Sequence, residues 1–426
     1  MIHPAGQPSL VYADAQGNIK DFPDLHAAGM SGGNFKLPDK KDFIPLPEGS
    51  ELFVLPGRLP VGCDVATGEA LLVEEDPFSG ETIQAVAAFM SPAHTAILIS
   101  AYQTTENAPR LPLFAYTAIG WYDDRFWTTA FRSDNDIRQD CAQFNQDEIN
   151  SKTAKKLRQN KNNRLIQHLG KCCLTYACPA ARNYFLGRWE APLPTSPICN
   201  ARCVGCISLQ ASGKCSATQD RIQFVPTPSE IGQVAIPHLQ EAEDAIVSFG
   251  QGCEGEPLLQ ADTLEKAIIA IRKKTDRGTI NLNSNASLPS AIQRLAGSGL
   301  DSLRVSLNSA QELYHHKYYR PQNFSLSDVL ESIRVMKGEG GFVSLNYFIL
   351  PGFTDSLPEF DALSTLINTF QPNRIQLRNL NMDPEWYLRS IALDSSVISM
   401  GMRQWYEKIN VTFPQLQLGY YNPSIR

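Results

Sequence analysis

This chain lacks the long apolar runs and the surplus of basic charge that would place it in two large protein classes. No stretch approaches eighteen consecutive apolar residues, so we expect no transmembrane helix. The opening sequence, MIHPAGQPSLVYADAQGN, has neither a basic segment nor an apolar one, so we expect no signal peptide and a cytoplasmic protein. The formal net charge of −6 argues against a general nucleic-acid binder.

Cysteine is absent from the last third of the chain and concentrated in its middle. Of the ten cysteines, seven lie between Cys141 and Cys206, and none follows Cys253. Without an export signal, these residues are expected to be thiols in a reducing compartment rather than disulfides. Metal or redox chemistry is therefore expected in the middle of the chain.

The length of 426 residues, 43% of them apolar, predicts two or three domains. Residues 1–132 contain short apolar runs separated by proline and glycine, which predicts a smaller, β-rich N-terminal domain. Residues 133–195 are polar and helix-compatible, and we interpret them as a helical linker region that contains cysteines. Residues 386–426 are expected to form a C-terminal helical extension.

Residues 196–385 alternate between apolar strand patterns and amphipathic helix patterns. Strands are predicted at 244–250, 278–286, 300–309, 342–352 and 373–381, and helices at 229–243, 258–274, 287–299, 325–340 and 356–370. With a further strand expected near the cysteines, this makes about six βα units and predicts an α/β fold, a partial (βα)6-type parallel barrel. Functional residues of such a fold lie at the carboxyl ends of the strands.

The segment SPICNARCVGCISLQ brings Cys199, Cys203 and Cys206 together within eight residues. A structural zinc site needs a fourth ligand, which Cys215 could supply. Alternatively, three thiolates could hold three irons of a [4Fe–4S] cluster and leave the fourth iron open. The spacing fits both, but the triplet opens a series of βα units whose strands end in polar or glycine-rich sequences. This position favours a site with an open coordination position.

The ordered motifs from about residue 190 to 385 resemble the radical S-adenosylmethionine (SAM) superfamily. The cysteines match its C-x3-C-x2-C motif, and GEPLL at 255–259 resembles the end of its Gly-Gly-Glu-Pro motif. NSNASL and GLDSLRVSLNSAQELYHHKYYRP resemble the family's next two strand ends. Two positions depart from the pattern: Gly205 stands where the family usually has an aromatic residue, and Glu254 replaces the first glycine of the second motif.

The resemblance implies an oxygen-sensitive enzyme whose [4Fe–4S] cluster is held by Cys199, Cys203 and Cys206. SAM would bind the open iron and be cleaved reductively to methionine and a 5′-deoxyadenosyl radical, which abstracts hydrogen from a substrate. The residues expected to bind SAM lie at the strand ends. They are Gly255 for close backbone approach, Glu256 or backbone carbonyls beside it for the ammonium group, Asn283 and Asn285 for ribose or carboxylate, Arg304 for the carboxylate, Ser306 and Asn308 on the same strand face, and Asn346 for adenine.

The remaining cysteines leave alternatives open. Cys172, Cys173, Cys178, Cys215 and Cys253 could bind a second iron–sulfur cluster, or Cys253 could act catalytically by carrying a substrate fragment. Because no cysteine follows Cys253, the C-terminal auxiliary-cluster domain of peptide-modifying relatives is not expected. An alternative function, from another class, is a zinc-binding interaction protein with a catalytically silent α/β core.

The substrate is not identified by any motif. Six basic residues and no acidic one between Lys152 and Arg164 form either a solvated helix face or a phosphate-contacting patch. RNA is therefore an alternative substrate, but the acidic net charge favours a small molecule or a protein. Radical SAM chemistry also implies a low-potential electron donor such as flavodoxin or ferredoxin, and no membrane partner is expected.

Overall fold

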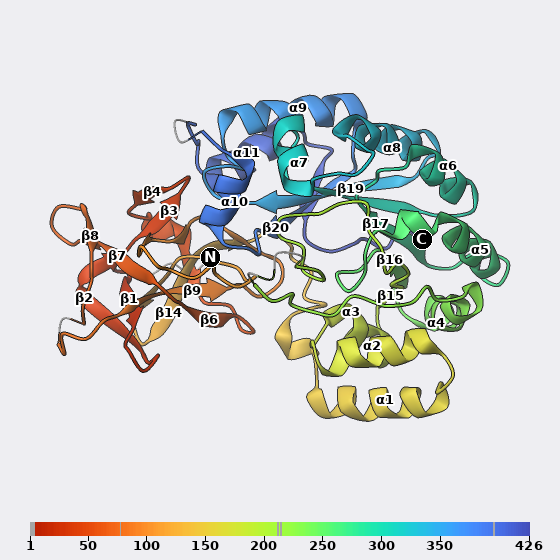
Figure 1. The fold of residues 1–426 in the computed structure, drawn as a ribbon, viewed down its shortest axis with the longest axis horizontal. Coiled ribbons are helices and arrows are strands. Elements are labelled where there is room, and N and C mark those ends of the chain that lie inside the picture. The colour runs from red at the N-terminus through yellow and green to blue at the C-terminus, as the bar shows by residue number, and fades with distance from the viewer. Residues whose placement is uncertain (1–4, 77, 211–212, 214, 395–396) are drawn as a thin grey trace.

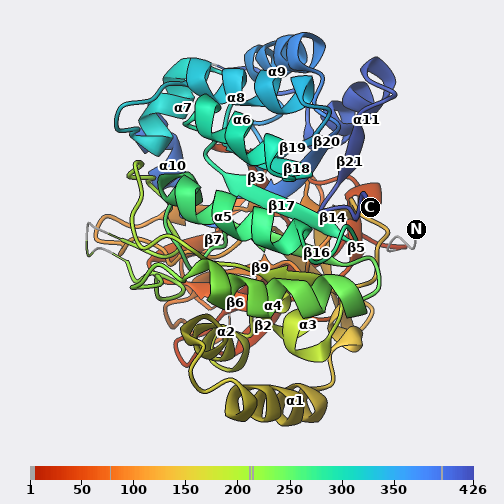
Figure 2. The ribbon, with the colours of Figure 1, turned by 90° about the vertical axis from the view of Figure 1, so that its right-hand side faces the viewer.

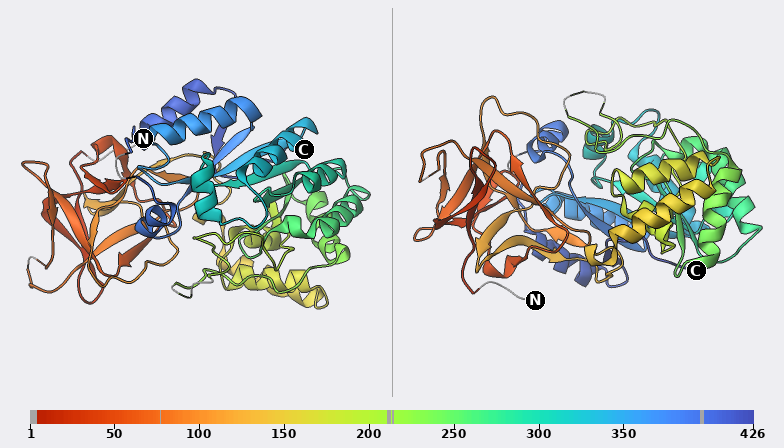
Figure 3. Two further views of the ribbon diagram at one scale, coloured as in Figure 1. Left: turned by 45° about the horizontal axis from the view of Figure 1, so that its top comes forward. Right: turned by 90° about the horizontal axis from the view of Figure 1, so that it is seen from below.

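A computed structural model describes residues 5–76, 78–210, 213, 215–394 and 397–426 of the chain. Figure 1 shows an N-terminal β-rich part on one side and an α/β part on the other, with three helices below. The two parts are distinct in each further view, and the long axis of the molecule runs from one to the other (Figure 3). The α/β fold with a parallel sheet, preceded by a β-rich region, is as predicted.

The N-terminal part consists of antiparallel strands, most of which form one strongly curved sheet. Its path runs β10-β14-β13-β1-β2-β7-β12, and a second, small sheet has the order β11-β3-β4. The strands are β1 (Ser9–Ala13), β2 (Ile19–Ala27), β3 (Gly29–Ser31), β4 (Asn34–Lys36), β5 (Phe43–Pro45), β6 (Glu51–Leu55), β7 (Arg58–Asp64), β8 (Ala70–Leu72), β9 (Gln84–Phe89), β10 (His94–Ala96), β11 (Ile99–Ser100), β12 (Tyr102–Thr104), β13 (Ile119–Tyr122) and β14 (Arg125–Arg132).

Three helices connect this part to the α/β core: α1 (Gln146–Gln159), α2 (Arg164–Leu174) and α3 (Pro179–Leu186). The side chains of Asn145 and Asn163 accept hydrogen bonds at the amino ends of α1 and α2, which fixes where both helices begin. The buried face of α2, including Leu165, Leu169 and Cys172, belongs to the same hydrophobic core as the parallel sheet.

The core sheet has seven parallel strands in sequence order: β15 (Glu190–Pro192), β16 (Ile246–Phe249), β17 (Thr279–Ser284), β18 (Ser302–Leu307), β19 (Phe342–Ile349), β20 (Arg374–Asn379) and β21 (Gln417–Gly419). The first and last strands lie outside the predicted core of 196–385, so those boundaries were too narrow. The C-terminal segment is also not purely helical. Both edge strands have three residues, too few for an apolar pattern to identify them.

Helices cover the outer face of this sheet, as Figure 2 shows. They are α4 (Pro228–Glu241), α5 (Ala261–Arg272), α6 (Pro289–Gly297), α7 (Glu312–Tyr319), α8 (Leu326–Gly338), α9 (Leu357–Phe370), α10 (Pro384–Ile391) and α11 (Met402–Thr412), with a 3-10 turn at Pro257–Gln260. Ser325 and Ser356 are the N-cap residues of α8 and α9. None of the helices in the described part of the chain combines the length and apolarity that a membrane crossing requires.

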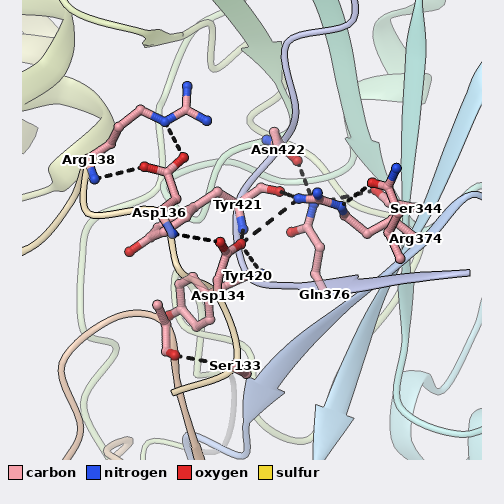
Figure 4. Close-up of polar contacts among 12 residues, drawn as sticks. Ser133, Asp134, Asp136, Arg138, Ser344, Arg374, Gln376, Tyr420, Tyr421 and Asn422 are labelled. Carbon is pink, nitrogen blue, oxygen red and sulfur yellow. Dashed lines mark hydrogen bonds and ion pairs between the residues drawn. The ribbon is translucent and has the colours of Figure 1, made fainter. Parts of the chain in front are cut away.

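The C-terminal tail after β21 joins the first strand of the sheet to the sixth. The Asn422 side chain donates to Glu190 of β15 (2.8 Å) and accepts from Gln376 of β20 (2.8 Å). Figure 4 shows the tail held beside Asp134, whose carboxylate accepts from the Tyr420 amide at 2.8 Å. The tail therefore spans the side on which the partial barrel lacks strands.

The N-terminal part rests on the carboxyl ends of β19 and β20. The Asn379 side chain, at the end of β20, accepts from the Ala96 amide (2.9 Å) and donates to the His94 carbonyl (3.0 Å). Nearby, the buried Arg58 and Asp383 form an ion pair at 3.1 Å. These contacts place the β-rich domain against the same end of the barrel at which function was expected.

Candidate active site

The cysteine triplet lies in the long loop at 193–227, which follows the carboxyl end of β15 and leads into α4. Two backbone hydrogen bonds fix it against the end of α7: the Arg202 amide donates to the Tyr319 carbonyl (2.9 Å) and the Val204 amide to the Tyr318 carbonyl (3.0 Å). The three thiols are therefore held between the first and fourth strand ends of the core.

A second loop, residues 250–256 after β16, packs directly on the segment that precedes Cys199. The Gly255 amide donates to the Ser196 carbonyl (2.7 Å) and the Glu256 amide to the Ile198 carbonyl (2.8 Å). A Cβ atom at Gly255 would stand 2.0 Å from the Ile198 oxygen. Gly255 thus permits a close approach to the cysteine loop, and its approach to SAM stays a prediction.

Glu254, which departs from the family pattern, fastens these two loops together. Its buried carboxylate accepts from the amides of Thr195 (2.7 Å), Ser196 (2.8 Å) and Gln251 (2.7 Å). Burial raises the pKa of Glu254 to about 7 even though these three amides favour the ionised form. The acidic residue therefore has a structural reason to be present where a glycine was expected.

Glu256, Asn283 and Asn285 are also engaged within the protein. The Glu256 carboxylate accepts from the Ser284 hydroxyl (2.6 Å), the Asn285 amide (2.9 Å) and the Leu258 amide (3.0 Å). Burial raises its pKa to about 7. The Asn285 side chain donates to Asn200 (2.8 Å), and Asn283 donates to the Gly250 carbonyl (2.9 Å). The predicted contact of the Glu256 carboxylate with an ammonium group is therefore corrected: this group links β16 to β17.

The geometry of the three thiols fits a [4Fe–4S] cluster better than one zinc ion. Thiolates bound tetrahedrally to one zinc ion lie about 3.8 Å apart, whereas a cubane spreads its thiolates over separate irons. In the described part of the chain, the sulfurs of Cys199, Cys203 and Cys206, with or without that of Cys215, do not lie within 4.8 Å of one another. Burial raises the pKa of Cys199 to about 11 and that of Cys203 well above its usual value, so bound cations are needed to hold them as thiolates.

A cavity of about 370 Å³ opens beside two of the cysteines. Of the predicted site residues, Cys203, Cys206, Arg304, Ser306 and Asn346 line it. Gly205 and Glu254, noted above as departures from the family pattern, line it too. Sequence analysis did not single out several other lining residues, because they carry no motif of their own. They are Gln251 and Met382 from strand-end loops, Tyr318 and Tyr319 from α7, Phe348 from β19 and Arg378 from β20.

Two arginines, one on β18 and one on β20, place positive charge at the wall of this cavity. Arg304 of β18 and Arg378 of β20 both donate to the Gln376 side-chain oxygen at 3.1 Å, and the Nε atom of each is buried without a partner. Burial, together with the charge of Arg378, lowers the pKa of Arg304 to about 9. Both residues also line a second cavity of about 250 Å³ below the first. Such a pair is suited to an anionic group.

Asn308 and Cys253 do not reach the cavity. The Asn308 amide is fully buried and donates to the Tyr314 carbonyl and the Tyr387 hydroxyl, both at 3.2 Å. Cys253 lies on the side of its loop that faces α2, within 4.8 Å of ligand atoms from that helix. The catalytic role predicted for Cys253 is therefore corrected, because its sulfur points away from the substrate-sized space.

The other departure, Gly205, has a steric explanation. A Cβ atom at this position would meet the Met382 sulfur at 2.8 Å and the Tyr318 hydroxyl at 3.2 Å. The space that an aromatic side chain takes in the family pattern is thus filled here from β20 and α7. Gly205 remains compatible with the cysteine motif.

The basic run at 152–164 is partly used inside the protein. Lys156 lies 3.9 Å from the centre of the Tyr184 ring, and Lys152 pairs with Glu148 one helical turn away. Arg164 binds Glu230 through two nitrogens, at 2.9 and 2.8 Å. These contacts favour the interpretation of the run as a helix surface.

Comparison with known proteins points to one superfamily. Residues 193–363 match the family described as the Radical SAM superfamily. A stretch of 179 residues is 25% identical to the FeMo cofactor biosynthesis protein NifB of Klebsiella pneumoniae, covering 38% of each chain. The chain thus spans well under half the length of that relative.

Solved structures with a related arrangement include SuiB of Streptococcus suis bound to S-adenosylmethionine, with a TM-score of 0.41 and 13% identity over 64% of this chain and 62% of that chain. A radical SAM methyltransferase from Sphaerobacter thermophilus has a TM-score of 0.39 and 13% identity over 55% and 67% of the two chains. The family match covers the cysteine loop, the loop at 250–256 and the strands β16 to β19. Residues 193–363 of this chain are therefore similar in sequence to the radical SAM superfamily.

Proposed function

We propose that this protein is a radical SAM enzyme that cleaves SAM reductively and abstracts hydrogen from a substrate bound in the same cavity. The observation that carries the proposal is the position of the three half-buried thiols. They lie in the loop after the first strand, and two of them, Cys203 and Cys206, line a cavity that is also lined by two partly unpaired arginines. A purely structural metal site would not require that cavity.

Cys199, Cys203 and Cys206 would hold the [4Fe–4S] cluster. When bound, the cluster and SAM supply the reductive cleavage that yields methionine and a 5′-deoxyadenosyl radical. Arg304, which lines the cavity and whose Nε atom is buried without a partner, would bind the SAM carboxylate. Asn346 has a buried side-chain oxygen without a partner and would accept from a donor on the nucleoside.

The upper wall of the cavity is apolar, formed in part by Tyr318, Tyr319, Phe348 and Met382. Burial raises the pKa of both tyrosines well above their usual value, so they stay neutral even in alkaline solution. An apolar wall suits a reaction in which a carbon-centred radical must not be lost to side reactions. The substrate that we favour is a small molecule or a protein segment.

Two partners belong to the proposal. A low-potential electron donor such as flavodoxin or ferredoxin would supply the reducing electron. RNA is not favoured as substrate, because three of the six basic residues at 152–164 have partners within the protein.

The test is anaerobic purification with iron reconstitution, followed by reduction with dithionite in the presence of SAM. We expect about four irons per chain and slow formation of 5′-deoxyadenosine and methionine without added substrate. Replacing the three cluster cysteines with alanine should abolish both. A full cluster with tight SAM binding and no 5′-deoxyadenosine would contradict the proposal and would indicate another use of SAM, such as ordinary methyl transfer.

Arg304→Ala provides a finer test of the cavity. Losing a bidentate carboxylate partner costs about 1.5–3 kcal/mol, which corresponds to about a tenfold to hundredfold loss in SAM affinity. Iron content should not change, because Arg304 donates its hydrogen bond to Gln376 of β20 and not to the cysteine loop. Unchanged SAM affinity would place the carboxylate elsewhere.

A further inference from the structure

His168, Cys172 and Cys253 converge from two segments that are distant in sequence. His168 and Cys172 lie one turn apart on the same face of α2, and Cys253 lies in the loop at 250–256. One ligand atom from each lies within 4.8 Å of the other two. The His168 Nε2 atom is 3.6 Å from the Cys172 sulfur, and both cysteines are buried.

The backbone holds this arrangement from both sides. The Cys253 carbonyl accepts from the Ile222 amide (2.8 Å), and the Cys172 carbonyl accepts from the Cys178 amide (3.1 Å). Neighbouring Cys173 is excluded, because its sulfur points toward Thr153 of α1, 3.5 Å away. The structure therefore does not bring together Cys172, Cys173 and Cys178 as ligands of a second cluster.

The spacing of these three donors suits a single metal ion. Two thiols and an imidazole are the ligand types that zinc prefers, and its tetrahedral geometry places neighbouring ligand atoms about 3.3–3.8 Å apart. The cluster triplet, by contrast, is not confined within 4.8 Å. We propose that His168, Cys172 and Cys253 bind one divalent transition-metal ion of the zinc type, separate from the [4Fe–4S] cluster. A water molecule would complete the coordination.

The ion would have a structural task near the cluster. It would link α2 to the loop that contains Glu254, whose carboxylate holds the amides of Thr195 and Ser196. Those two residues begin the segment that leads to Cys199. The metal would thus stabilise the platform on which the cluster loop rests, but its binding does not depend on the proposed SAM chemistry.

The test is to count zinc and iron per chain after anaerobic removal of loosely bound metal and addition of zinc alone. We expect one zinc ion in the wild-type protein and in Cys173→Ser, the matched control for a buried thiol on the same helix. Cys172→Ser and Cys253→Ser should bind no zinc. The variant that lacks the three cluster cysteines should keep its zinc while losing iron and SAM cleavage, which separates this proposal from the proposed function.

Two measurements cover the case in which a buried cysteine variant does not fold. His168 is only half-buried, so His168→Ala should fold and should lower zinc affinity by at least about tenfold. Cobalt(II) added to the metal-free wild-type protein should show the intense absorbance of a tetrahedral thiolate site. Zinc that is absent from the wild-type protein, zinc that persists in both single cysteine variants, or a disulfide between Cys172 and Cys253 in the anaerobic protein would overturn the proposal.

Discussion

Replacing Gly255 with alanine should damage the cluster site without direct contact with the cluster. The new Cβ atom would stand 2.0 Å from the Ile198 oxygen, and Cβ contacts below 3.0 Å are essentially never seen, so one loop must move by about 1 Å. That movement breaks the hydrogen bond from the Glu256 amide to Ile198. Overpacking costs about 1–3 kcal/mol and the lost hydrogen bond about 1 kcal/mol, so we expect a destabilisation of about 2–4 kcal/mol.

The effect should be concentrated at Cys199, because its amide is also 3.2 Å from the new Cβ atom. We therefore expect iron per chain to fall well below the wild-type value after identical anaerobic reconstitution, with a lower urea midpoint. Gly338→Ala, at the end of α8 with no atom within 4 Å of its Cβ position, is the control. It should be neutral or slightly stabilising. Wild-type iron content and stability in Gly255→Ala would refute the account of this loop.

Three further predictions follow from buried charges. Asp383→Ala should destabilise the protein by about 3–5 kcal/mol in urea unfolding, because it leaves Arg58 buried without its partner; a loss below about 1 kcal/mol would contradict this. Arg221→Gln should lower the reduction potential of the cluster in an EPR-monitored titration, because Arg221 donates to the Cys206 sulfur at 3.5 Å; an unchanged potential would rule this out. Because burial raises the pKa of Glu254 to about 7, the folded protein binds this proton more tightly than the unfolded chain does. The contribution of the proton to the free energy of unfolding is therefore present at low pH and is lost as pH rises through 7. From pH 6 to pH 8 the cluster-free wild-type protein should therefore lose about 1.3 kcal/mol relative to Glu254→Gln; a constant difference would contradict the assignment.

The alternation of strands and helices could be predicted from the sequence because both patterns are local. The spacing of apolar residues within a strand or an amphipathic helix predicts which of its side chains are buried, whichever segments pack beside it. The predicted strand at 342–352 and helix at 356–370 accordingly match β19 (Phe342–Ile349) and α9 (Leu357–Phe370) to within a few residues. A strand was expected near the cysteines, but its bounds were not, and β21 was missed, because three residues are too few to form a pattern and pairing with β16 and β20 makes these segments strands.

For the candidate site, too, some features could be predicted from the sequence and others could not. The cysteine spacing and the order of the strand-end motifs identified the superfamily from sequence, since both are linear properties of the chain. The sequence also placed Arg304, Ser306 and Asn346 on strand ends, and all three line the cavity. The sequence could not predict that the Glu256 carboxylate accepts hydrogen bonds from the Ser284 hydroxyl and the Asn285 amide, because these partners depend on which strands become neighbours.

The sequence by itself thus determined the class of fold, and it predicted the three cluster ligands and the end of the barrel at which chemistry is expected. The tertiary structure decided which side of a loop each residue faces. Cys253, two residues before Gly255, turns toward His168 and Cys172 and away from the cavity, whereas Arg378, which has no motif, comes to lie beside Arg304. The physical reason is that a loop's path depends on the packing of distant segments, here α2 beneath one strand end and β20 two strands away, and no local pattern encodes that packing.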